Sequence, residues 1–132
     1  MKLDFLDERH KERYIKICFI NSNCIDDREY MTAAYMLSIS EQVFDKAISY
    51  ITEYGIRFDD LLKKQDLTPA TCFYIQVVDS IFRWEEIQLN LSDIKYLDYP
   101  HLFGLINGIK IFTGYDLIKE GYELLQKMIE TV

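Results

Sequence analysis

The sequence predicts an all-α fold: a single compact domain over residues 1–132, with roughly six or seven helices around one buried central helix. Apolar residues recur at helical spacing along nearly the whole chain, and helix-starting and helix-ending residues separate the apolar segments. Alternating strand patterns are nearly absent. Of the 132 residues, 49% are apolar and 14% are aromatic, which supplies one substantial core. This composition excludes a disordered tail and a disulfide-dense mini-protein.

The N-terminal part contains two predicted helices. Asp7 is placed to cap a first helix that runs to about Ile20, and the polar residues 21–23 interrupt it. Asp26, followed three residues later by Glu29, has the spacing of a capping box. This spacing predicts that a second helix begins there.

The middle of the chain contains the predicted central helix. Ser40 begins a third helix, and we expect Gly55 to end it in the left-handed conformation. A short fourth helix is predicted over residues 58–64. Pro69 begins a fifth, because proline at the first helical position loses no hydrogen bond. Residues 69–84 are apolar except for a narrow polar stripe, so we expect this helix to be the most buried one.

The C-terminal part contains a short turn and two further predicted helices. Residues 92–97 suggest a single helical turn. Asp98 begins a helix to about Thr113, and Gly114 ends it. Asp116 opens the last helix, whose inward residues we expect to be Leu117, Ile118, Leu125, Met128 and Ile129.

The charge and the cysteines restrict the function classes. The formal charge is −7, from 22 acidic and 15 basic side chains, and such a surface repels phosphate. We therefore expect no direct binding to nucleic acid. The longest apolar-rich stretch, residues 102–112, has 11 residues, whereas a membrane span needs about 20, so no membrane contact is expected. Three cysteines without a C-x-x-C motif and the lack of a secretory leader predict a reducing cytoplasm.

Each of the two histidines follows an aspartate by three residues: Asp7 precedes His10, and Asp98 precedes His101. Carboxylate–histidine pairs at this spacing hold di-metal centres in some helical bundles. Both aspartates, however, stand at predicted helix starts, which produce the same spacing, and the bridging glutamates of such a centre are not visible. We expect no metal and no cofactor.

Gln76, Asp79 and Arg83 form most of the polar stripe on the predicted central helix. A partly buried carboxylate can serve as a general base, and perturbed carboxylates cluster at active sites. The commoner reason for an Asp–Arg pair four residues apart is mutual neutralisation on a helix that buries nearly everything else. These three residues are the alternative polar site.

Two further motifs have a structural and a binding interpretation. Gly104 and Gly108 form a G-x-x-x-G motif, which in a soluble helix indicates close approach of a neighbouring helix in the same fold, or else a homodimer contact. Trp84 beside Glu85 and Glu86 is a candidate anchor for a partner with a basic surface, although a lone tryptophan usually belongs to the core.

Three segments resemble a known protein family. Residues 5–14 (FLDERHKERY) are similar to the opening of a family of small helical proteins found in Firmicutes and their phages and mobile elements. Residues 96–103 (YLDYPHLF) and 108–112 (GIKIF) resemble its C-terminal turn and its Ala-Ile-Lys-Ile helix, with Gly108 in place of the alanine. The resemblance covers about half the chain. It implies a helical fold in a bacterial or phage cytoplasm; the family has no assigned activity, so no functional residue is implied.

Motifs for phosphate binding, dinucleotide binding, zinc hydrolysis and serine hydrolysis are absent from the sequence. Our leading hypothesis is a non-enzymatic, acidic protein-binding factor, such as an inhibitor, immunity or counter-defence protein of a phage or mobile element, present as a monomer or homodimer. The alternative is a small enzyme or ligand-binding protein that uses the polar site at Gln76, Asp79 and Arg83.

Overall fold

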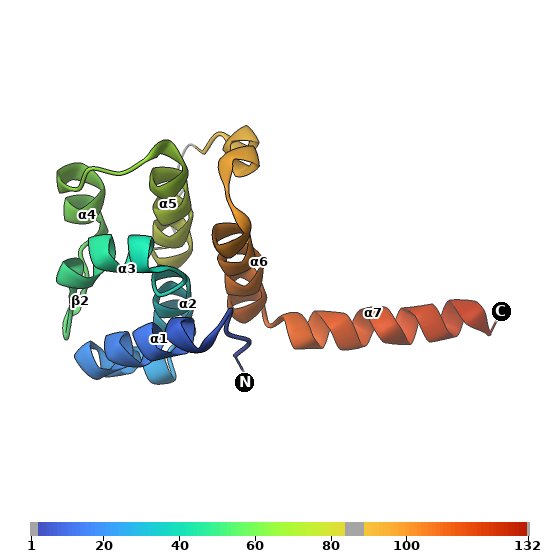
Figure 1. Cartoon of the computed structure of the whole chain (residues 1–132). Coiled ribbons are helices and arrows are strands. Elements are labelled where there is room, and N and C mark those ends of the chain that lie inside the picture. The colour runs from blue at the N-terminus through green and yellow to red at the C-terminus, as the bar shows by residue number, and fades with distance from the viewer. Residues whose placement is uncertain (1–2, 84–88, 132) are drawn as a thin grey trace.

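The computed structural model describes residues 3–83 and 89–131 and confirms the all-α fold. Within the described residues, six α-helices form a compact body, and a seventh projects from it (Figure 1). The α-helices are α1 (Glu8–Ile20), α2 (Arg28–Leu37), α3 (Glu41–Ala47), α4 (Phe58–Lys64), α5 (Pro69–Arg83), α6 (Tyr99–Thr113) and α7 (Tyr115–Glu130). Short 3-10 helices are η1 (Ser22–Ile25), η2 (Ile48–Tyr50) and η3 (Leu91–Tyr96), and the strands are β1 (Ile51–Thr52) and β2 (Gly55–Ile56).

Helix α2 is the centre of the body. It packs against α1, η1, α3, α5 and α6, and its six residues from Thr32 to Leu37 are all buried. The sequence analysis expected α5 in this place, but α5 lies beside α2, between α4 and α6 (Figure 1). The physical reason is that one side of α5, which holds Gln76 and Arg83, stays partly exposed, whereas the small side chains of Ala33 and Ala34 let neighbours approach α2 closely.

Polar side chains tie α1 to the end of α2. The Arg13 guanidinium donates to the carbonyl oxygens of Ser38 (2.7 Å from Nε) and Ile39 (3.1 Å). These carbonyls lie just beyond the last residue of α2, where a helix leaves carbonyl groups unpaired and favours a cation. The Tyr14 hydroxyl donates to the carbonyl of Cys24 (2.8 Å), which holds η1 against α1.

Most helix starts are those predicted. Asp7, Ser40 and Asp98 each accept a hydrogen bond from a backbone N–H three residues later. The second helix differs by one residue: Asp27, not Asp26, caps α2 and accepts from the N–H groups of Glu29 (3.1 Å) and Tyr30 (3.3 Å). The capping-box spacing selected Asp26, but an aspartate caps a helix without a glutamate three residues later, and the adjacent Asp27 takes this place.

A small hairpin replaces the predicted end of the third helix. α3 ends at Ala47 and η2 follows, after which Ile51 pairs with Ile56 and Thr52 pairs with Gly55. Gly55 therefore lies in a strand. The expectation that it ends the third helix was wrong. Buried Asn21 donates from Nδ2 to the Thr52 carbonyl (2.9 Å), which fixes the hairpin against the end of α1.

The two glycines of the G-x-x-x-G motif bring α6 against α2 and α5. A Cβ atom on Gly108 would lie 2.6 Å from Cγ of Met36, and one on Gly104 would lie 2.9 Å from Cγ1 of Ile39. Real Cβ atoms do not approach neighbours so closely, so only glycine allows this packing. The motif is therefore internal to the fold, as in the first of the two interpretations above.

Candidate functional site

Helix α7 leaves the body after a single residue. Gly114 ends α6 with φ 70° and ψ 48°, the left-handed conformation that glycine adopts without strain, as predicted. Its N–H donates to the carbonyl of Lys110. α7 begins at the next residue and runs outward, with its main packing contact on α6 (Figure 1).

The apolar side of α7 is exposed. Five large apolar residues on it are between 57% and 72% exposed: Tyr122, Leu124, Leu125, Met128 and Ile129. The sequence analysis expected Leu125, Met128 and Ile129 to point inward, and the structure shows that this was wrong. Leu117 and Ile118, which were expected to join them, lie outside the residues whose side chains are described. Helical spacing identifies an apolar side but does not say whether another element covers it.

The opposite side of α7 is polar. Turning 100° per residue, the helix places its exposed polar residues together on the other half of its circumference: Lys119, Glu120, Glu123, Gln126, Lys127 and Glu130. Among the residues of α7 whose side chains are described, the apolar ones therefore cover about half of the circumference, which is wider than a simple two-helix contact requires.

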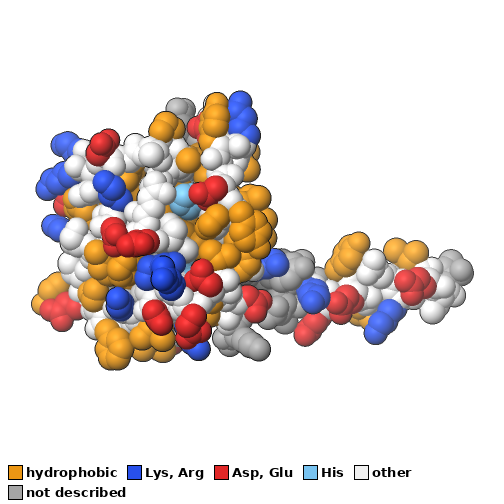
Figure 2. All heavy atoms as spheres, in the orientation of Figure 1, with side chains coloured by type: hydrophobic (Ala, Val, Ile, Leu, Met, Phe, Trp, Pro, Cys, Tyr) orange, Lys and Arg blue, Asp and Glu red, His pale blue; other side chains and the backbone are white. Residues whose placement is uncertain are grey.

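Helix α6 has a second apolar side that the body leaves uncovered. Leu102, Ile106 and Ile109 follow each other at helical spacing and are 37–46% exposed. We call these three residues the α6 strip. The other side of α6, with His101 and Leu105, is buried in the body. Apolar side chains gather over α6 and along α7 in Figure 2, so the two surfaces lie on neighbouring elements.

A separate apolar groove of about 460 Å³ lies where α1, η1 and α2 meet. Its lining includes Phe19, which is 88% exposed, and Ile25, which is also exposed. The remaining lining residues are Leu3, Tyr14, Ile15, Cys18 and Met31. Neither this groove nor the α6 strip was recognised from the sequence, because an apolar residue outside the predicted inner stripe gives no sign of what surrounds it.

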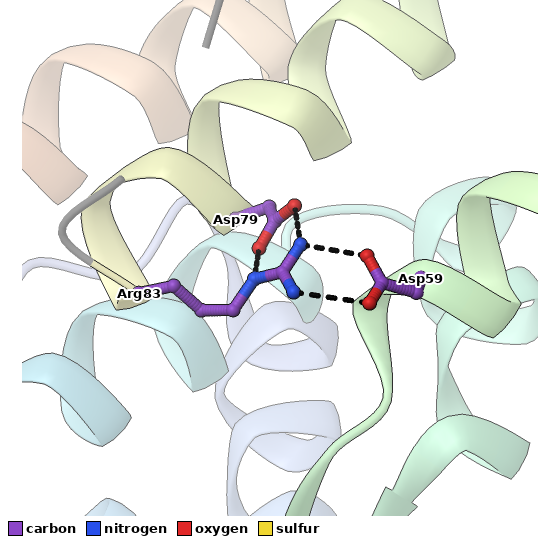
Figure 3. Close-up of polar contacts among 3 residues, drawn as sticks. All are labelled: Asp59, Asp79 and Arg83. Atoms are coloured by element: carbon purple, nitrogen blue, oxygen red, sulfur yellow. Dashed lines mark hydrogen bonds and ion pairs between the residues drawn. The ribbon is translucent and has the colours of Figure 1, made fainter. Parts of the chain in front are cut away.

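The predicted ion pair between Asp79 and Arg83 exists, and Asp59 of α4 joins it (Figure 3). Arg83 donates from Nε and Nη2 to the Asp79 carboxylate, the second bond being 2.7 Å long. It also donates to Asp59 from Nη2 (2.9 Å) and Nη1 (3.2 Å). Two edges of the guanidinium therefore each bind one carboxylate: Nε and Nη2 bind Asp79, and Nη1 and Nη2 bind Asp59. The bridge joins α5 to α4.

The geometry of this bridge is that of a structural contact. Asp79 is 1% exposed, so water and substrate do not reach its carboxylate. The hydrogen bonds that Arg83 donates to Asp79 and Asp59 raise the pKa of Arg83, and the same bonds lower the pKa of Asp59. Gln76 lies on the same helix and is half-buried. This arrangement fits the mutual-neutralisation interpretation of the polar site better than the general-base one.

Both histidines are buried at helix starts. The Leu6 N–H donates to Nδ1 of His10 (3.0 Å), so His10 carries its proton on Nε2 and donates it to the Tyr35 carbonyl (2.8 Å). Burial lowers the His10 pKa to about 4. Within residues 3–83 and 89–131, no group of three or more His, Cys, Asp or Glu side chains is placed to hold a metal ion.

His101 pairs with the aspartate before it. Its Nδ1 lies 3.0 Å from Oδ1 of Asp98, whereas Nε2 is buried and has no hydrogen-bond partner. Burial also lowers the His101 pKa. The ring packs against that of Tyr74, with centroids 5.1 Å apart, and Nε2 lies in the protein interior.

Trp84, Glu85 and Glu86, the predicted partner anchor, lie outside the described residues. In the part of the chain that the structure describes, no helix has the length and apolarity to cross a bilayer. A comparison of the chain with protein-family models, curated proteins and solved structures finds no match.

Proposed function

We propose that the protein is a non-enzymatic factor that binds another protein through the apolar side of α7. The exposure of this side is the observation that carries the proposal. The exposure of five large apolar residues to water is unfavourable, and their burial against a partner lowers the free energy. The binding of an amphipathic helix in an apolar groove is a recurrent mode of protein recognition.

The charge of α7 favours a protein partner over a lipid or nucleic-acid surface. Helices that lie on membranes or along phosphate backbones carry mainly Lys and Arg on their polar side. The described polar side of α7 holds three glutamates, one glutamine and only two lysines. Anionic surfaces therefore repel this helix, whereas a protein groove needs only apolar contact.

A finer proposal concerns the role and the location of the protein. The formal charge of −7 supports an inhibitor, immunity or counter-defence factor that meets a partner with a basic surface, because opposite charges speed association. The three cysteines are free thiols, which supports a cytoplasmic location. Membership of the helical family of Firmicutes and their phages remains part of this finer proposal.

The experiment compares two full-length variants of α7. Leu125→Glu places a carboxylate on the apolar side, and Lys127→Glu places one on the polar side. With a lysate of bacteria that also produce the untagged chain as the source, we expect the wild type and Lys127→Glu to capture the same dominant protein, and Leu125→Glu to lose it. The captured protein is then purified, and its affinity for each variant is measured; a loss of roughly tenfold or more is expected for Leu125→Glu alone.

The salt dependence separates the two surfaces that can bind. Apolar contact by α7 persists when the ionic strength rises, whereas binding by the acidic surface weakens steeply. Equal affinity of the wild type and Leu125→Glu, with complex formation lost in high salt, would overturn the role of α7.

A further inference from the structure

We propose that the partner of α7 is a second copy of this chain. Two α7 helices pack antiparallel in a twofold dimer, and the end of each reaches the α6 strip of the other copy. This inference rests on the proposed function, since it names the protein that α7 binds.

The exposed apolar area matches the area that a dimer needs. The five apolar residues of α7 and the three of the α6 strip together expose on the order of 900 Å² per chain, since a large apolar residue presents roughly 200 Å² when fully exposed. The largest apolar patch of an ordinary monomer is about 300–600 Å², and a stable interface buries about 800 Å² per partner. The two surfaces together are therefore of the size that each chain buries in a stable pair.

The pattern on α7 suits a helix of the same kind. Tyr122, Leu125 and Ile129 are separated by three and four residues, the spacing of the seam between two paired helices. Leu124 and Met128 lie beside this seam and widen the apolar side to half the circumference. A second α7 covers the seam, and the remaining width needs another apolar surface, which the α6 strip supplies.

The direction of α7 explains why the pair is antiparallel. α7 points away from its own body (Figure 1), so antiparallel pairing puts the two bodies at opposite ends and keeps them apart. The helix has 16 residues and a length of about 24 Å. The C-terminal end of each α7 then meets the base of the other, where Ile106 and Ile109 lie within two turns or so of Gly114.

The arrangement is closed. Each copy offers the same two surfaces, α7 and the α6 strip, and each receives the same two, as a twofold interface requires. The apolar groove between α1 and η1 stays free in this dimer, so it supplies a control.

The experiment measures the mass of the full-length protein by sedimentation equilibrium from about 1 to 100 μM, because interfaces of this size have dissociation constants in the micromolar range or below. We expect the wild type to reach twice the chain mass of 15.8 kDa. Leu125→Glu with Ile129→Glu is expected to remain a monomer with unchanged helix content by circular dichroism. Ile106→Glu is expected to raise the dissociation constant roughly tenfold, because a pair of α7 helices alone does not touch α6.

Two controls keep the dimer. Lys127→Glu on the polar side of α7 and Phe19→Glu in the apolar groove leave the mass unchanged. A wild type that is monomeric at the highest concentration overturns the inference, and so does a dimer that Phe19→Glu dissociates. If the monomeric wild type still binds a different purified protein through Leu125, only this inference fails and the proposed function stands.

Discussion

At the scale of single residues, the buried polar groups show what a sequence can and cannot give. The sequence analysis placed Asp7 at the start of the first helix, three residues before His10, and the structure confirms this cap, because the pattern is local. The bond that the Leu6 N–H donates to His10 is also local, whereas the bond to the Tyr35 carbonyl crosses a tertiary contact that no spacing reports. The Arg83 bridge is similar: the bond to Asp79 was predictable from four-residue spacing, and the bond to Asp59 on another helix was not.

The buried histidines predict how stability depends on pH. The His10 pKa is about 4 in the folded protein, against 6.5 for an ordinary histidine, and burial also lowers the His101 pKa. Between pH 6.5 and 4, His10 binds a proton in the unfolded chain but not in the folded protein, so the free energy of unfolding falls as the pH falls. His10 contributes about 1.4 kcal/mol per pH unit between pH 6.5 and 4.

Urea denaturation at pH 7, 6, 5 and 4.5 measures this effect. His10→Gln should have a shallower pH dependence than the wild type, since glutamine does not titrate and the carboxylates are common to both proteins. Parallel curves for the two proteins would contradict the assignment.

At the scale of elements, most helix starts were predictable, because capping uses side chains within three residues of the N–H groups they satisfy. Asp7, Ser40, Pro69 and Asp98 all begin helices as expected. The hairpin over residues 51–56 was missed, since two strands of two residues are too short to show alternation. The sequence left two interpretations of the glycines in α6, packing within the fold and a homodimer contact. The position of Met36 in the structure decides for packing within the fold.

The close approach of α6 to α2 predicts the effect of one methyl group. Gly108→Ala forces the new Cβ against Met36 in a packed interface, and we expect the free energy of unfolding to fall by about 1–3 kcal/mol. Thr113→Ala, at an exposed site on the same helix, should change it by about 0.5 kcal/mol or less. Chemical denaturation measures both. A Gly108→Ala protein as stable as the wild type would show that the helices are not in contact at this point.

At the scale of the whole molecule, the division into a body and a projecting helix was not predictable. The apolar side of α7 is as regular as that of a core helix, and periodicity is the same whether the cover comes from the same chain or from another. The sequence analysis therefore assigned these residues to the core and looked for the binding surface among the charges. The direction in which a helix leaves its neighbour depends on the conformation of the connecting residue and on contacts far away in the sequence.

This division predicts a contrast in hydrogen exchange. In dilute protein the amides of α7 should exchange much faster than those of α2, because α2 is enclosed on several sides and α7 packs mainly against α6 at its base. Raising the protein concentration to about 100 μM should slow exchange in α7 if a second copy covers it, and leave α2 unchanged. Mass spectrometry of the labelled peptides measures both regions in one sample. Strong protection of α7 at the lowest concentration would contradict the projecting position.

Gly114 connects these scales, because it alone separates α6 from α7 and has a conformation that other residues adopt only with strain. The φ and ψ angles of Gly114 thus set the direction of the sixteen residues of α7. A residue with a side chain at position 114 would favour a continuous helix through α6 and α7. The apolar side of α7 would then point in another direction, although its residues would be the same. One substitution at position 114 therefore gives a related chain a new binding geometry, because it changes the direction of α7 without changing the residues that bind.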